Sequence, residues 1–166
     1  MDMPSREIWH EIRINASPSD VYEAVTDVDK LAHWWTTDTR GQSDVGKTLE
    51  FWFSKSRASA IMEVTALQPY ELVQWRVIDG SAAEWIGTEL EFKIFPDQGR
   101  TVLHFRHSNW DPEAKMFPEC SLTWALFLVS LKEFVETGKG RPYPYDMPVN
   151  TVRPPKSTPI PVAQSA

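Results

Sequence analysis

Cysteine, long apolar runs and positive charge are all scarce in this chain of 166 residues. The single cysteine, Cys120, excludes a disulfide framework or a cysteine-based metal site within one chain. No apolar run approaches the roughly 18 residues that a membrane span needs. The formal charge of -6 argues against a nucleic-acid or anionic-membrane partner. The opening stretch MDMPSRE has no apolar core of the kind found in signal peptides, so we expect a cytoplasmic protein.

Several catalytic and metal-binding motifs are missing as well. The chain contains no HxH, HExxH or CxxC spacing, so we expect no metal ion. It also lacks a glycine-rich phosphate loop and a GxSxG nucleophile elbow. We therefore expect no cofactor, and we expect Cys120 to act as a small apolar residue of the core.

Aromatic residues, by contrast, are abundant, with eight Trp and eight Phe. Such wide side chains either fill a thick core or line a cavity. The adjacent pair Trp34 and Trp35 follows a short helical pattern, and neighbours on a helix point about 100° apart. We expect one of them to plug the core and the other to lie half exposed at a cavity mouth. The alternative is that both are packing residues that close one end of a sheet.

Period-two alternation of apolar and polar residues is typical of half-buried strands. It recurs in six segments, at residues 7–15, 46–54, 58–69, 71–80, 87–97 and 100–110. Hairpin-length connections between the last five predict a mainly antiparallel sheet with one wet face.

Helical patterns occupy the remaining ordered part of the sequence. Ser17 as N-cap with Pro18 at the first helical position begins one helix, and a second short helix is predicted from about residue 29 to 35. A long helix opens at Pro118 and ends before Gly138, with one apolar stripe. The order of elements favours an α+β fold in which a curved antiparallel sheet of about six strands wraps around the long C-terminal helix.

The segment 139–166 has a different composition, with seven of the thirteen prolines. We predict a folded domain over residues 1–138 followed by an extended Pro-rich tail. Trp9 and Trp52 have the parity of the wet face, and we place them on neighbouring strands. Exposed aromatic surfaces accept extended Pro-rich segments, so we expect the tail to fold back over this pair.

Several stretches, taken in order, resemble one superfamily. They are IRINASPSDVYEAVTD, KLAHWW, the strand from Gly46 to Phe53, VTALQPYELVQWRV, TVLHFRHSNW and the Trp124 to Leu131 part of the last helix. Over roughly residues 7 to 138 the chain resembles the START / Bet v 1-like (SRPBCC, polyketide-cyclase-like) superfamily. Within it, the chain is most similar to stand-alone homologues of the heat-shock chaperone ATPase activator. The resemblance implies a helix-grip fold with a deep apolar cavity between sheet and helix.

The side chains predicted to face that cavity form the candidate ligand-binding set. They are His10, Trp35, Phe51, Phe53, Met62, Trp75, Trp85, Phe92, Phe105, His107, Trp110, Trp124, Phe127, Leu128 and Leu131. A pocket is mainly apolar with a few placed polar groups, so the two histidines are the informative members. They could bond a ligand oxygen or move a proton, or each could be a satisfied core histidine. Glu84, next to Trp85, is the best candidate for a carboxylate at the cavity rim.

The superfamily includes lipid and hormone binders, polyketide cyclases and chaperone co-factors, so the fold alone leaves function open. We expect binding of a small hydrophobic or aromatic molecule in the cavity. The first alternative is a cyclase- or hydrolase-type enzyme that uses the cavity histidines. The second is a chaperone co-factor or protein-interaction module that uses the outer face. A small apolar molecule is the expected partner, and a protein partner or a homodimer stays open.

Overall fold

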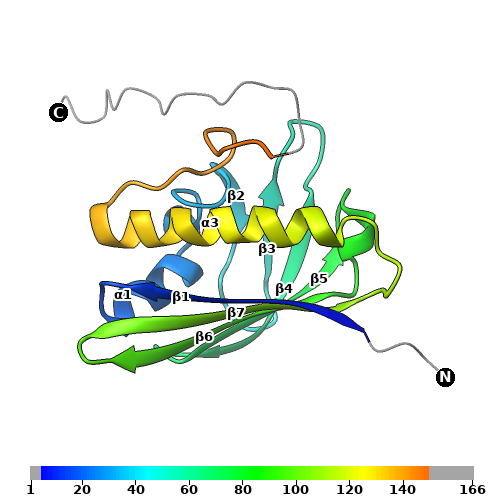
Figure 1. Ribbon diagram of the computed structural model, residues 1–166. Helices are drawn as coiled ribbons and strands as arrows, with labels where there is room; N and C mark the ends of the chain where they lie inside the picture. Colours follow the sequence, from blue (N-terminus) through cyan, green and yellow to red (C-terminus); the bar gives the residue numbers. More distant parts are fainter. Residues whose placement is uncertain (1–4, 150–166) are drawn as a thin grey trace.

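The structure, a computed structural model, describes residues 5–149. One curved sheet lies across a long helix, and two short helices close one end (Figure 1). The elements are β1 (Arg6–Ile14), α1 (Pro18–Thr26), α2 (Val28–Leu31), β2 (Asp38–Gly41), β3 (Thr48–Trp52), β4 (Ala60–Gln68), β5 (Leu72–Asp79), the 3-10 turn η1 (Ala83–Trp85), β6 (Glu89–Asp97), β7 (Arg100–Trp110) and α3 (Phe117–Thr137). The strand order is β1-β7-β6-β5-β4-β3-β2, with antiparallel neighbours. The predicted α+β helix-grip architecture is confirmed.

The sheet has seven strands within the described residues, one more than the sequence pattern predicts. The additional strand is β2, whose sequence DTRG has no apolar alternation. It pairs with β3 through backbone bonds, with Asp38 opposite Trp52 and Gly41 opposite Leu49. An edge strand held by backbone pairing and bearing polar side chains leaves no period-two signal.

The helix ends follow the predicted capping residues in most places. The Ser17 hydroxyl accepts the Asp20 N–H at 3.2 Å and begins α1. Gly138 ends α3 in the left-handed conformation, at φ 85°. The second short helix is shorter than predicted, because α2 ends at Leu31 and residues 32–35 form turns. No helix of the described residues has the length and apolarity needed to cross a membrane.

Both members of the Trp34–Trp35 pair are buried, with 0% and 1% of their surfaces exposed. The prediction that one of them is half exposed was wrong. Because the helix has already ended, its 100° spacing does not apply, and the two rings stack at 6.1 Å with an interplanar angle of 15°. The Trp34 indole N–H donates to the Ala24 carbonyl at 2.8 Å. Trp34 thus ties the turn to α1, and Trp35 reaches the centre of the molecule.

The described start of the Pro-rich tail packs beside α3 and the 33–37 segment (Figure 1, orange). The Tyr143 N–H donates to the Trp35 carbonyl at 2.8 Å, and the Thr37 N–H donates to the Tyr143 carbonyl at 3.1 Å. A Cβ at buried Gly140 would lie 2.5 Å from the His33 carbonyl oxygen, so only glycine fits this approach. The predicted docking over Trp9 and Trp52 therefore does not hold for residues 139–149, and residues 150–166 lie outside the described part.

The two tryptophans of the outer sheet face are far apart in strand order. Trp9 lies on β1 at one edge and Trp52 on β3 near the other, with four strands between them. Trp9 is 54% exposed beneath Arg106, whereas Trp52 is half-buried beneath Arg40. Placing them on neighbouring strands was wrong, because parity gives the face of a strand and not its neighbours.

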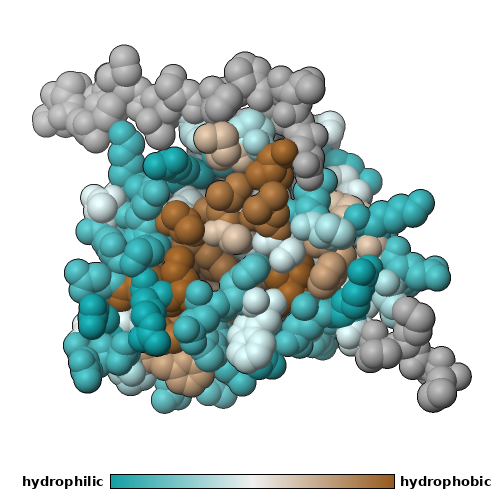
Figure 2. All heavy atoms as spheres, viewed as in Figure 1, coloured by the Kyte–Doolittle hydropathy of each residue, from teal (hydrophilic) through white to brown (hydrophobic). Residues whose placement is uncertain are grey.

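The long helix α3 has a second apolar surface besides the one that packs on the sheet. Leu122, Leu126 and Val129 are exposed at helical spacing, and we call them the α3 outer stripe. Figure 2 shows apolar side chains in brown gathered over this helix. The stripe is therefore available for contact with another surface.

Candidate functional site: an apolar pocket at the start of α3

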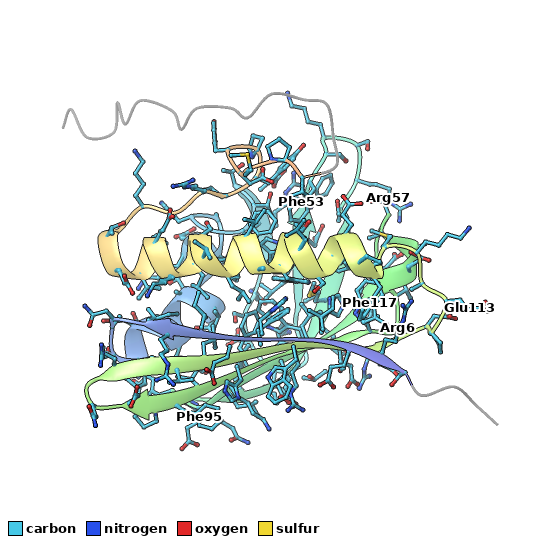
Figure 3. All side chains as sticks on the ribbon, in the orientation of Figure 1. Arg6, Phe53, Arg57, Phe95, Glu113 and Phe117 are labelled. Carbon is cyan, nitrogen blue, oxygen red and sulfur yellow. The ribbon has the colours of Figure 1, made fainter. Side chains whose placement is uncertain are left out.

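A pocket of about 460 Å³ opens between the first turns of α3 and the loops at one end of the sheet. Its size falls within the roughly 300–1,000 Å³ of small-molecule sites. The lining residues are Trp35, Phe53, Ser59, Ala60, Ser81, Ala82, Trp85, Met116, Glu119, Cys120, Thr123, Trp124 and Phe127. In Figure 3, Phe53 lies beside α3 on the β3–β4 side, and Phe117 marks the first turn of the helix.

Three tryptophans form the main wall of this pocket. The ring centroids of Trp35 and Trp124 lie 4.8 Å apart, those of Trp85 and Trp124 lie 6.1 Å apart, and those of Trp35 and Trp85 lie 6.4 Å apart. Phe53 and Phe127 add an edge-on pair at 6.2 Å. Each ring packs against at least one other ring, so the wall is a continuous aromatic surface.

Cys120 lines the pocket, but its thiol is a poor nucleophile. The Trp85 indole N–H points at its Sγ at 3.4 Å, and burial raises the pKa of the thiol to about 11. The nucleophilic form of cysteine is the thiolate, which is a small fraction at neutral pH when the pKa is this high. Cys120 therefore contributes a small, polarisable surface to the pocket.

His107 is buried, outside the pocket lining, and bonded at both ring nitrogens. The Trp124 indole N–H lies 3.1 Å from Nδ1, and Nε2 lies 2.8 Å from the Thr88 hydroxyl oxygen. Because an indole nitrogen can only donate, Nδ1 must accept, which places the proton on Nε2. Thr88 in turn donates to the Trp85 carbonyl. Burial lowers the pKa of His107 to about 3, so the ring is neutral at physiological pH.

His10 lies on the same sheet face as His107 but bonds elsewhere. In the β1–β7 register His10 is opposite Phe105, and Ile8 is opposite His107, so the two imidazoles are diagonal neighbours. The Nε2 atom of His10 lies 3.1 Å from the Ser121 carbonyl oxygen and so acts as a donor. The two histidines do not meet at a shared ligand position, and His10 is likewise outside the pocket lining.

Apart from His10 and His107, the structure divides the predicted site residues into two groups. Five of them line the pocket: Trp35, Phe53, Trp85, Trp124 and Phe127. Eight others are buried in the core outside the lining: Phe51, Met62, Trp75, Phe92, Phe105, Trp110, Leu128 and Leu131. The pocket is thus smaller than the full space between sheet and helix, because these eight side chains occupy much of that space.

Some lining residues were not singled out from the sequence. Ser59, Ser81 and Ala82 come from the loops opposite α3, where no periodic signal marks an inward position. Ala60 begins β4 with the same parity as Met62, so the alternation of that strand could have identified it. Glu119 and Thr123 could have been found, because they lie at i and i+4 of a helix whose next i+4 position is Phe127.

Glu84 was predicted at the cavity rim and has a structural role instead. Its carboxylate accepts the N–H groups of Lys115 and Met116 at 2.9 and 2.8 Å. These groups immediately precede α3, so the side chain holds the chain where the helix begins and offsets the positive end of the helix dipole. Glu84 is not part of the pocket lining.

The sheet that grips a single long helix, with an apolar pocket between them, defines the START / Bet v 1-like (SRPBCC) class. Residues 15–136 match the family described as "Activator of Hsp90 ATPase homolog 1-like protein", and the chain belongs to this family. The comparison with curated proteins finds no match.

Solved structures agree with this assignment. The Aha1 dimer from Colwellia psychrerythraea is 37% identical, with a TM-score of 0.73 over 81% of this chain and 99% of that one. CalU16 from Micromonospora echinospora is 18% identical, with a TM-score of 0.65 over 79% of this chain and 74% of that one. SSP2350 from Staphylococcus saprophyticus is 16% identical, with a TM-score of 0.67 over 82% of this chain and 97% of that one. The last two share the fold alone.

Proposed function

We propose that the chain binds a small apolar or aromatic molecule in the pocket at the start of α3. The observation that carries this proposal is the wall of five aromatic residues around about 460 Å³ of space. Phe53 and Trp85 are only partly buried there, so a bound molecule would remove aromatic surface from water. Burying apolar surface yields about 25 cal/mol per Å², which supports affinity without charged groups.

An enzyme of the cyclase or hydrolase type receives less support from the same geometry. His107 has no free ring nitrogen and is neutral, and Cys120 is protonated. Glu119 is the one carboxylate that the described residues contribute to the lining, and it lies at the exposed start of the helix. Acid–base chemistry needs a group placed on the reacting atom, and the two predicted histidines lie outside the pocket.

The direct test is native mass spectrometry of protein purified from its own host, followed by denaturing extraction. We expect an apolar small molecule at about one per chain in the wild type, as for a single pocket. Thr123→Trp fills the pocket from α3 and should abolish the bound species. Leu122→Trp, one residue along on the exposed side of the helix, is the matched control and should retain it. Equal retention by both variants would contradict the proposal.

A chaperone co-factor role is the second candidate, supported by the family to which the chain belongs. Its proposed surface is an aromatic row on the outer sheet face, where the Trp9, His104 and Phe95 rings are neighbours at 5.7 and 5.0 Å. Trp9 and Phe95 are exposed. In this case the chain raises the ATPase rate of an Hsp90-class chaperone, and Trp9→Ser lowers that effect several-fold. A rate unaffected by the wild-type chain excludes the role.

A second copy of the chain is the proposed occupant of the α3 outer stripe. The relative from Colwellia psychrerythraea is described as a dimer, and the stripe is an apolar surface of the kind that dimer interfaces bury. Light scattering after gel filtration should give twice the chain mass for the wild type. Val129→Glu should shift it to the monomer, whereas Val45→Glu, on an exposed loop residue, should not. A wild-type monomer at high concentration contradicts this assembly.

A further inference from the structure

The charge of the pocket lining is one-sided. Among residues 5–149, Glu119 is the one charged member of the lining, and none of the lining residues is Lys, Arg or His. Arg57 and Lys115 are close in sequence to lining residues but do not belong to the lining, and Arg57 is paired with Asp79 at 3.8 Å. A ligand carboxylate would therefore find no opposite charge in the pocket and would meet the carboxylate of Glu119.

Two of the three wall tryptophans, Trp85 and Trp124, share this disfavour toward an anion. The indole N–H of Trp85 is directed at Cys120, and that of Trp124 is directed at His107. Both groups are therefore used inside the protein and are not available to an anionic ligand. What these rings offer is their surface, and the face of an indole carries the negative part of its quadrupole. Tryptophan is the aromatic side chain that attracts cations most strongly.

The positive end of the α3 dipole is the feature that would favour an anion here. Glu84 already occupies that end, through the N–H groups of Lys115 and Met116. Glu119 adds a second carboxylate in the first turn. These two charges offset the half-unit of positive charge at a helix start, and the chain as a whole carries a formal charge of -6.

We propose that the pocket selects lipophilic cations, meaning a protonated or quaternary amine attached to an aromatic or aliphatic body, over neutral and anionic molecules of the same shape. The proposal rests on the proposed binding function and names the ligand class of that site. The apolar body packs against Phe53, Phe127 and the tryptophans, and the ammonium group lies between the indole faces and the Glu119 carboxylate.

Three probes with one phenylbutyl body test this selectivity: a trimethylammonium, an alcohol and a carboxylate. Binding is measured by quenching of tryptophan fluorescence and by calorimetry on the full chain. We expect the ammonium probe to bind at least about tenfold more tightly than the alcohol, and the carboxylate to bind most weakly. Glu119→Gln should remove most of the preference for the ammonium probe, read as the ratio of the ammonium and alcohol affinities within each variant. Glu71→Gln, in the turn between β4 and β5, is the equal-charge control and should change neither.

The outcomes separate the two proposals. Binding of the alcohol with equal or tighter binding of the carboxylate overturns the cation preference and leaves the pocket as an apolar binding site. An unchanged preference in Glu119→Gln overturns the assignment of the carboxylate. Failure of all three probes to bind, together with an empty chain in native mass spectrometry, overturns the binding function itself.

Discussion

Trp35→Ala is expected to lower the free energy of unfolding by about 3–5 kcal/mol, the range for removing a buried large aromatic side chain. The Trp35 ring contacts six other aromatic rings: Trp34, Phe51, Phe53, Trp75, Trp85 and Trp124. It belongs to the core on one side and to the pocket wall on the other. The variant leaves a cavity between the sheet and α3. The Pro-rich tail adjoins the same point, because the Trp35 carbonyl accepts the Tyr143 N–H.

Urea unfolding followed by circular dichroism measures this loss. Trp9→Ala removes the same side chain from the exposed outer face and should change stability by no more than about 1 kcal/mol. The comparison isolates the effect of burial from that of indole removal. A loss in Trp35→Ala no larger than in Trp9→Ala would show that the ring is not part of the packed core.

The pH dependence of stability provides the second large effect, and it arises at His107. Its pKa is lowered from 6.5 to about 3 by burial. Between these values the unfolded chain takes up a proton that the folded chain does not, so protonation favours unfolding. The stability associated with neutral His107 is therefore complete above pH 6.5 and falls as the pH drops toward 3. The slope approaches about 1.4 kcal/mol per pH unit in that window.

His107→Gln should remove this component. Between pH 7 and pH 5 the wild type is expected to lose about 2 kcal/mol more than the variant, a window in which most carboxylates stay ionised. His104→Gln, on the outer face, should keep the His107 slope. Denaturant midpoints measured at constant ionic strength across this range give the pH dependence of stability for the wild type and both variants. Parallel pH profiles for wild type and His107→Gln would mean that the ring takes up a proton as readily in the folded protein as in the unfolded chain.

The hydrogen bonds around the His107 ring explain why it stays neutral in the folded protein. His107 can stay neutral because Trp124 donates to Nδ1 and Thr88 accepts from Nε2. A protonated ring would turn Nδ1 into a second donor facing the Trp124 indole N–H, with no acceptor to receive it. The interpretation of His107 as a satisfied core histidine thus has a specific geometric basis, and the trio of Trp124, His107 and Thr88 links α3 to β7 and the residue preceding β6.

Most of the regular elements could be predicted because their signals are local. Alternation along 100–110 predicted β7, and the faces that it predicted, with Leu103, Phe105 and His107 inward, match the burial of that strand. Ser17 and Gly138 mark helix ends through their own backbone and side-chain preferences. The polar strand β2 was not predicted, because its backbone pairing with β3, and not its composition, makes it a strand.

The candidate site was less predictable, for reasons visible in single residues. The sequence showed that Glu84 is a carboxylate next to a tryptophan, but not that two N–H groups some thirty residues later would use both of its oxygens. It placed His10 and His107 on one face, but not in separate hydrogen bonds. The loop residues of the pocket, such as Ser59 and Ser81, have no periodicity that could identify them.

The sequence by itself determined the class of fold, the inward faces of the main strands, the long helix and the aromatic character of the interior. These follow from periodicity and capping, which act over a few neighbouring residues. Only the tertiary structure decided which aromatics fill the core and which surround open space. It also stacked Trp34 on Trp35 and seated the tail on the 33–37 segment. The physical reason is that packing joins residues distant in the chain, and whether a space stays open depends on every side chain that meets there.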